Sequence, residues 1–194
     1  MKNLFFVVLM AIGFVGMQAQ DEREVVDTEA SVLHWTGYKV LGNHTGDLSL
    51  EGGKISFDKD GNLTGGNFTI NMASLTVTDL EGGKAEKLAG HLHSADFFNS
   101  AEFPTASLLI KKVISRGKTG EYKIIADLTI KGITKEIKFN AITSTENKQT
   151  VLKADITIDR SDFDIRYGSG SFFDSLGDNT IYDEFDVSVE LVVE

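Results

Sequence analysis

Apolar and polar residues alternate with a period of two along much of the chain. The clearest run spans residues 122–131, where one face carries Tyr122, Ile124, Ala126, Leu128 and Ile130. Similar alternation marks residues 33–35, 48–50, 55–57, 68–72, 137–141, 152–158 and 185–193. This periodicity predicts β-strands that each have one apolar and one polar face.

Glycine-rich segments separate these runs and predict tight turns. They include Gly52-Gly53, the segment 58–61, Gly65-Gly66 and Gly132. Only residues 84–92 read as helical, with Leu88 and Leu92 four positions apart. We therefore expect an all-β protein of about eight antiparallel strands with one short helix. A barrel is favoured because closure removes both sheet edges, but alternation alone does not exclude a sandwich.

The composition agrees with a sheet protein, and the N-terminal segment predicts export. The chain has 19 glycines, 13 phenylalanines and a single proline. Lys2 precedes an apolar run over residues 4–15, which is too short to cross a bilayer and predicts a signal peptide over residues 1–19. We expect one domain over residues 20–194, exported to the periplasm or secreted, without stable membrane insertion.

Charge and cysteine content exclude several classes of function. The formal net charge is −10, which argues against nucleic acid as a partner. The chain has no cysteine, so disulfides, thiol chemistry and a lipid-modified cysteine are excluded.

Three segments look like catalytic or ligand-binding motifs but fail on spacing. Residues 117–119 resemble the end of a phosphate-binding loop, yet Lys112 stands where its first glycine is required. Residues 58–60 begin like a calcium loop, which then lacks the glycine and the glutamate that it needs. Residues 168–171 do not match the G-x-S-x-G elbow of hydrolases. We interpret all three as turns or loops.

The four histidines do not predict a metal site. A transition-metal site needs three or four converging ligands. His91 and His93 lie at the end of the expected helix, where positions i and i+2 do not face each other. His34 and His44 lie in the first two strand regions. We expect no metal, and polar or hydrogen-bonded roles for these side chains.

Two further segments have both a structural and a functional interpretation. Phe97, Phe98, Phe103 and the sole proline lie within residues 97–104, where they form either a plug at one end of a barrel or the wall of an apolar site. Arg160 follows an apolar strand and lies between acidic residues. A structural ion pair is the favoured role for Arg160, and contact with the polar head of a ligand is the alternative.

The ordered set of motifs resembles the YceI family. It comprises residues 35–39, 42–46, 65–75, 87–98, 103–106, 128–135 and 158–163. The resemblance implies an extended, lipocalin-like, eight-stranded antiparallel barrel with a long apolar pocket for a polyisoprenoid, such as an isoprenoid quinone or a prenyl phosphate. Asn71, Leu108 and Asp164 depart from the family pattern, which leaves pocket width and ligand identity open.

The expected function is therefore the binding, carriage or sequestration of a long apolar lipid, without catalysis and without a resident cofactor. The alternatives are an enzyme that acts on a lipid with a histidine as acid or base, and an interaction protein with a filled barrel. A homodimer is left open. The expected ligand-binding residues are Trp35, Phe57, Phe68, Ile70, Phe97, Phe98, Phe103, Leu128, Ile130, Phe139, Ile156 and Arg160.

Overall fold

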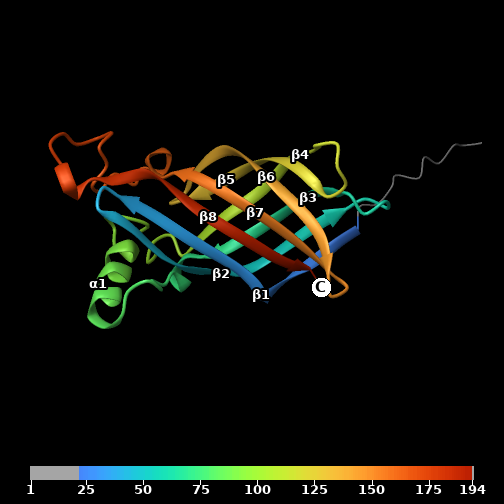
Figure 1. The fold of residues 1–194 in the computed structure, drawn as a ribbon, viewed down its shortest axis with the longest axis horizontal. Coiled ribbons are helices and arrows are strands. Elements are labelled where there is room, and N and C mark those ends of the chain that lie inside the picture. Colours follow the sequence, from blue (N-terminus) through green and yellow to red (C-terminus); the bar gives the residue numbers. More distant parts are fainter. Residues whose placement is uncertain (1–21, 194) are drawn as a thin grey trace, which may run out of the picture.

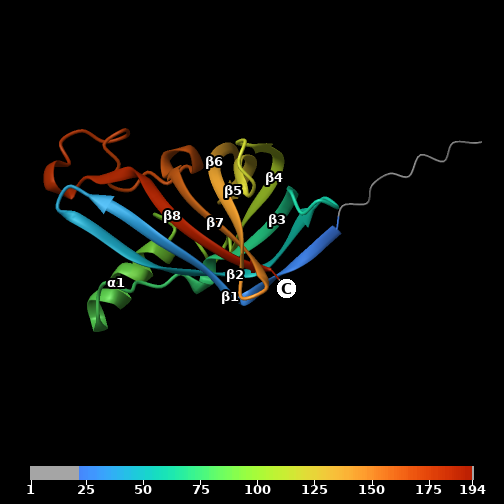
Figure 2. The same ribbon diagram turned by 45° about the vertical axis from the view of Figure 1, so that its right-hand side comes forward.

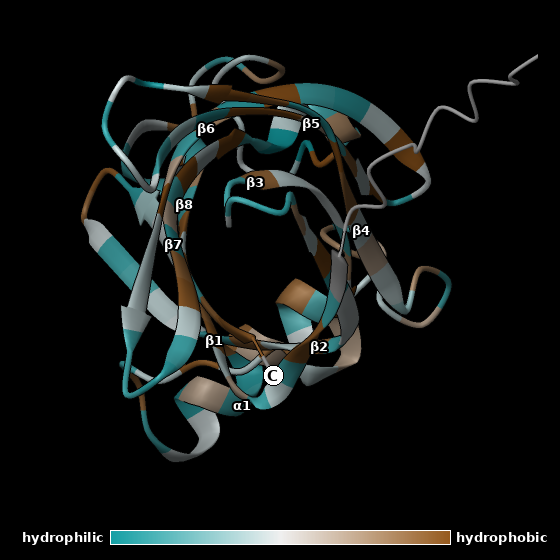
Figure 3. Cartoon of the chain, turned by 90° about the vertical axis from the view of Figure 1, so that its right-hand side faces the viewer, coloured by the Kyte–Doolittle hydropathy of each residue, from teal (hydrophilic) through white to brown (hydrophobic). Residues whose placement is uncertain are grey.

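Eight antiparallel strands form a closed barrel in the computed structural model, which describes residues 22–193 (Figure 1). The predicted signal peptide, residues 1–19, lies outside the described residues. The strands are β1 (Glu22–Lys39), β2 (Gly42–Phe57), β3 (Leu63–Asn71), β4 (Thr105–Ser115), β5 (Glu121–Ile130), β6 (Ile133–Glu146), β7 (Gln149–Asp159) and β8 (Ile181–Val193). Each strand pairs with its neighbours in sequence, and β1 closes the ring by pairing with β8 (Figure 3). The predicted barrel is confirmed, and the sandwich is excluded.

Within residues 22–193, one α-helix and three short 3₁₀ helices complete the fold. The helix α1 (Gly82–His93) confirms the predicted helical segment. The 3₁₀ helices are η1 (Met72–Ser74), η2 (Arg160–Phe163) and η3 (Gly177–Asn179). Figures 1 and 2 place α1, the β1–β2 turn and the β7–β8 connection at the same end of the barrel, which we call the helical end. No helix within residues 22–193 has the length and apolarity needed to span a membrane.

The prediction of two short strands separated by a glycine turn is wrong for β2. Residues 48–50 and 55–57 belong to one strand, and Gly52-Gly53 lies inside it rather than in a turn. The pairing of β2 with β3 shifts register between Leu50 and Gly52, as a β-bulge does. The extra residue changes the phase of the alternation, so that Leu50 and Ile55 are both buried although their positions differ in parity.

The prediction also missed β4 and misread a second glycine pair. Ala106 and Leu108 are buried on β4, but Leu109 is half exposed on the outer face. Another register shift follows Ile110, so the alternation along this strand is short and irregular. Gly65-Gly66 lies inside β3, whereas the turn at residues 58–61 is confirmed by a hydrogen bond of 2.9 Å from the amide of Gly61 to the carbonyl oxygen of Asp58.

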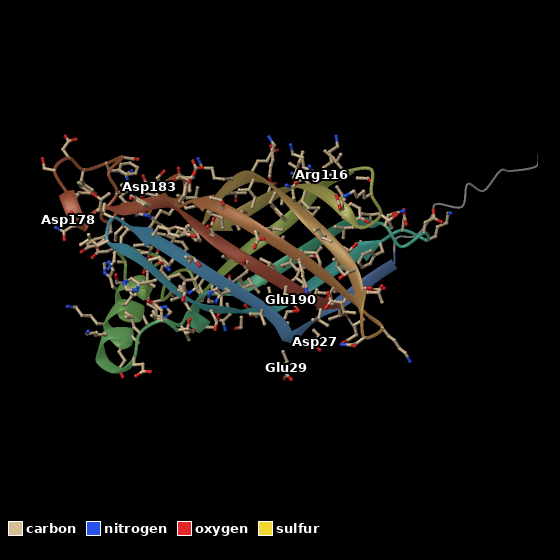
Figure 4. All side chains as sticks on the ribbon, viewed as in Figure 1. Asp27, Glu29, Arg116, Asp178, Asp183 and Glu190 are labelled. Carbon is tan, nitrogen blue, oxygen red and sulfur yellow. The ribbon has the colours of Figure 1, made fainter. Side chains whose placement is uncertain are left out.

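The barrel interior is the hydrophobic core. Along β5, the alternate residues from Tyr122 to Ile130 are all buried, as the alternation predicts. The charged side chains lie mainly on the outside, as the labelled Glu29 and Arg116 illustrate (Figure 4). An eight-stranded barrel has an interior that side chains just fill or that holds one small ligand, so the packing inside decides between these cases.

Candidate functional site

The middle of the barrel contains a cavity of about 110 Å³, which we call the inner chamber. All eight strands contribute to its wall, and every one of its 24 lining residues is apolar. Several of these residues, such as Phe139 and Val189, are only partly buried although they face inward. The inner chamber can therefore hold hydrocarbon but offers no side-chain hydrogen bond.

Small residues open the inner chamber. Ala141 on β6 pairs directly with Ala154 on β7, and both line the cavity. Since side chains directly opposite each other on one face of a sheet are in contact, two alanines at one such pair leave space that larger residues would fill. Ala106 on β4 lines the same cavity.

The barrel is filled by side chains at the end opposite the helical end. Ile55, Leu63 and Tyr122 are buried there and line neither chamber. The hydroxyl group of Tyr122 accepts a hydrogen bond of 3.2 Å from the backbone amide of Leu63, which joins β5 to β3 across the intervening β4. Side chains therefore lie between the inner chamber and this end of the barrel.

A second cavity of about 110 Å³, the outer chamber, lies at the helical end. Its wall combines apolar residues of α1 and the strands with the polar side chains of Tyr38, Lys39, His44, His91 and Arg160. Its surface is nevertheless almost wholly apolar, and among these polar side chains His91 has a buried ring nitrogen, Nε2, that lacks a hydrogen-bond partner.

Hydrogen bonds to β1 and β2 position the segment that leads into α1. The indole Nε1 of Trp35 donates to the carbonyl oxygen of Thr76 at 3.0 Å. The amides of Thr76 and Thr78 donate to the carbonyl oxygens of Asp47 and Thr45, at 3.0 and 2.9 Å. The segment therefore runs along β2 and brings α1 to the barrel mouth.

The side chain of Asp79 also binds this segment to β2. Its carboxylate accepts hydrogen bonds from the Thr45 amide at 3.0 Å and pairs with Nδ1 of His44 at 2.8 Å. Desolvation alone would raise the pKa of Asp79, but the bonds from His44 and Thr45 outweigh it and hold that pKa below its usual value. The Nε2 of His44 lies 3.2 Å from Nζ of Lys39, so both histidine nitrogens are engaged.

Arg160 is a buried structural residue at the edge of the outer chamber. Its guanidinium donates to the carbonyl oxygens of Ile165, Ile181 and Tyr182 at 2.7–3.1 Å and lies 3.2 Å from Asp183. It also lies 5.5 Å from the centre of the Phe97 ring. Burial lowers the pKa of Arg160, while the charge of Asp183 opposes that shift. The favoured ion pair is present, and these contacts occupy most of the donors that a ligand head would need.

The four histidines occupy different environments. His34 pairs with Asp47 at 2.7 Å, and His91 packs edge-on against Phe97 and Tyr167. Within residues 22–193, no group of three or more histidine, aspartate or glutamate side chains is placed to hold a metal ion.

The structure brings one serine next to a histidine. Nδ1 of His93 lies 3.0 Å from Oγ of Ser100, and its Nε2 lies 3.2 Å from the carbonyl oxygen of Leu75. Neither His93 nor Ser100 lines a chamber, and Ser100 is buried. The pair joins the end of α1 to the segments around it and is not placed to meet a substrate in either chamber.

The predicted site residues divide between the two chambers. Phe57 and Phe103 line neither: Phe57 is buried elsewhere in the barrel, and Phe103 is half-buried beside Gly132. Trp35, Phe97 and Arg160 line the outer chamber, and Phe98 lines both chambers. The remaining predicted residues line the inner chamber: Phe68, Ile70, Leu128, Ile130, Phe139 and Ile156.

The sequence-based prediction missed several lining residues. Leu108 and Ile110 were not among the expected ligand-binding residues, because β4 itself was not predicted, although Leu108 was named as a position that bears on pocket width. Phe185 lines both chambers and lies on the strand face that also carries Val187 and Val189, so the alternation along β8 could have identified it. Leu48 also lines both chambers, and it too lies in a run with a clear alternation.

Two curated relatives are similar to this chain in sequence. A UPF0312 protein of Vibrio cholerae is 29% identical over 142 residues, which cover 72% of each chain. A UPF0312 protein of Shewanella denitrificans is 33% identical over 131 residues, 64% of this chain and 63% of that protein.

Two solved structures have the same fold. Burkholderia cenocepacia BcnA superposes with a TM-score of 0.69 at 19% identity, over 87% of this chain and 99% of its own. A polyisoprenoid binding domain from Saccharophagus degradans gives a TM-score of 0.62 at 14% identity, over 90% of this chain and 99% of its own. The model of the YceI-like domain matches residues 25–193, almost the whole of the described barrel. The chain therefore belongs to the YceI-like family.

Proposed function

We propose that this protein binds a long apolar lipid, of the polyisoprenoid class, inside its barrel and carries or sequesters it without chemical change. The wholly apolar wall of the inner chamber is the observation that carries this proposal. Each buried CH₂ group contributes about 0.8 kcal/mol through the hydrophobic effect, so a chain of several isoprene units gains enough to offset the cost of its ordering. The polyisoprenoid-binding domain of Saccharophagus degradans, which has this fold, supports the same class of ligand.

The contacts of Arg160 favour a ligand with an uncharged head. A prenyl phosphate needs donors and positive charge at its phosphate, but three backbone carbonyls and Asp183 already engage the Arg160 guanidinium. Lys39, the other cationic side chain of the outer chamber, lies beside His44. We therefore favour an isoprenoid quinone or a prenol over a prenyl phosphate. The predicted signal peptide adds export to the periplasm or beyond the cell to the proposal.

The competing function is that of an interaction protein with a filled barrel. Small-molecule sites commonly enclose about 300–1,000 Å³, and each chamber alone is smaller than that. A lipid chain must therefore use both chambers or displace side chains that separate them.

Native mass spectrometry of protein purified from its host tests the proposal. We expect an adduct whose mass and organic extract correspond to a prenol or an isoprenoid quinone. A barrel that carries no adduct, and that takes up neither geranylgeraniol nor decylubiquinone when these are added, would contradict lipid binding and support the filled barrel.

A further inference from the structure

The two chambers share three lining residues, Leu48, Phe98 and Phe185, which we call the partition. Leu48 comes from β2, Phe98 from the α1–β4 connection and Phe185 from β8. The rings of Phe98 and Phe185 meet edge to face, with centroids 6.3 Å apart and planes at 75°. The chambers are therefore separated by side chains and not by backbone.

The backbone on both sides of the partition is fixed. Phe185 pairs with Ile158 on β7 and with Gly37 on β1, so it lies within the continuous ladder of the barrel. The amide of Phe98 donates to the carbonyl oxygen of Leu92 at 3.0 Å, and its ring packs against Phe97 at 5.2 Å. The partition can therefore open only by rotation of side chains, which requires no rearrangement of strands.

The chambers on either side differ in chemistry. The inner chamber has no polar lining residue, whereas Tyr38, His91 and Arg160 contribute to the outer chamber. The hydroxyl group of Tyr38 donates to Asp186 at 2.7 Å, which raises the tyrosine pKa and keeps the group neutral. A molecule that fills both chambers thus places hydrocarbon in the inner one and its more polar end in the outer one.

We propose that the partition selects the shape of the ligand. Each chamber, at about 110 Å³, is smaller than the cavity of about 150 Å³ that takes up benzene, so even a compact apolar molecule must push aside side chains of the chamber that it enters. A long ligand must pass between Phe98 and Phe185, which a single flexible chain does by turning the two rings apart. A rigid fused-ring lipid such as a sterol cannot bend and needs a wider opening than a single chain does. This inference rests on the proposed function and narrows its ligand to linear chains.

Two prenols that differ only in length provide the test. Geraniol has a short chain and geranylgeraniol a long one, and the ratio of their dissociation constants measures the passage through the partition. Phe185→Leu widens the passage, so geranylgeraniol should bind about two- to tenfold more tightly relative to geraniol, the range set by one aromatic pair. Phe185→Trp narrows the passage and should shift the ratio in the opposite direction.

Phe139→Leu is the matched control. Phe139 lines the inner chamber and not the outer one, so the same substitution there leaves the Phe98–Phe185 pair unchanged, and the ratio of the two dissociation constants should stay within about twofold of wild type. Phe98→Leu acts on the other ring of the pair and should reproduce the shift of Phe185→Leu, which keeps the test informative where Phe185→Trp does not fold.

The possible outcomes separate this inference from the proposed function. A wild-type protein that binds both prenols, with the same ratio in all variants, would overturn the partition and leave lipid binding intact. A folded wild-type protein that binds neither prenol would overturn lipid binding and, with it, the selection by chain shape.

Discussion

The indole of Trp35 donates to the carbonyl oxygen of Thr76 directly beside Gly46, and no other residue fits at that glycine. A Cβ atom at position 46 would overlap the Thr76 carbonyl oxygen and lie 2.7 Å from Nε1 of Trp35. The close approach of β1, β2 and the segment before α1 thus depends on a missing side chain.

Gly46→Ala should destabilise the protein by about 3 kcal/mol or more, because the methyl group meets backbone that cannot move without breaking the Trp35 bond. Denaturant unfolding followed by tryptophan fluorescence measures this loss, since Trp35 is the only tryptophan. Gly52→Ala is the control on the same strand: a Cβ there meets nothing within 4 Å, and stability should change by less than about 0.5 kcal/mol. Equal effects at the two positions would contradict the steric explanation.

Arg160→Met should cost about 3–5 kcal/mol of stability, because it leaves Asp183 without its cation and three carbonyl groups without a donor. Arg160→Lys should recover little of this, since an ammonium group cannot reproduce the planar fork that reaches all of these oxygens. Thermal unfolding with Arg166→Met as the comparison checks this. Arg166 is 57% exposed in its pair with Asp164, so its loss should cost less than about 1 kcal/mol. A mild effect of Arg160→Met would show that the β7–β8 connection is held by other contacts.

Asp79→Asn should weaken the protein at neutral pH and make its stability less sensitive to acid. The folded pKa of Asp79 is depressed, so its contribution is complete above the unfolded value of about 3.9 and is lost as the pH falls through the folded pKa. Unfolding at a series of pH values from 7 downward should show a gap of about 1 kcal/mol between wild type and variant that narrows below about pH 4. Asp174→Asn, at an exposed position, should show no such gap. A gap for Asp79→Asn that stays constant with pH would rule out the charge as its cause.

Ala154→Leu should fill the inner chamber and block it. Because the added carbons enter existing space, stability should stay within about 1 kcal/mol of wild type or rise, while the affinity for geranylgeraniol falls at least about tenfold. Ala126→Leu provides the contrast, since Ala126 is fully buried and lines neither chamber, and overpacking there should cost about 1–3 kcal/mol. Calorimetric titration and unfolding of both variants check the pair. Unchanged binding by Ala154→Leu would place the ligand elsewhere.

The sequence predicts the barrel well where one phase of alternation runs the length of a strand. On β5 every expected inward residue is buried, and the helix lies where Leu88 and Leu92 indicated it. It predicts poorly where a bulge shifts the phase, as after Leu50, or where an apolar residue such as Leu109 faces outward. Local pattern carries no information on such shifts, because they depend on pairing with a neighbouring strand.

The candidate site is less predictable than the fold. Alternation identifies inward residues, but it does not distinguish a packed position such as Ala126 from a cavity-lining one such as Ala154. That difference depends on which side chains lie opposite across the barrel. The partition could not be predicted from the sequence for the same reason. Phe98 and Phe185 are far apart in sequence, and their rings meet only once the barrel has closed.

The pairing of the first strand with the last also governs how this barrel forms. The amide of Val192 donates to the hydroxyl group of Ser31 at 3.0 Å, across 161 positions of the chain. Contacts between residues so far apart in sequence require a large loss of chain entropy before their interaction energy is gained. This order of events slows folding. Until β8 is in place, β1 and β7 both expose unpaired edges, which can pair with the edges of other chains. Removal of even a few residues from the end of β8 should therefore slow the closure of the barrel and prolong the exposure of these two edges.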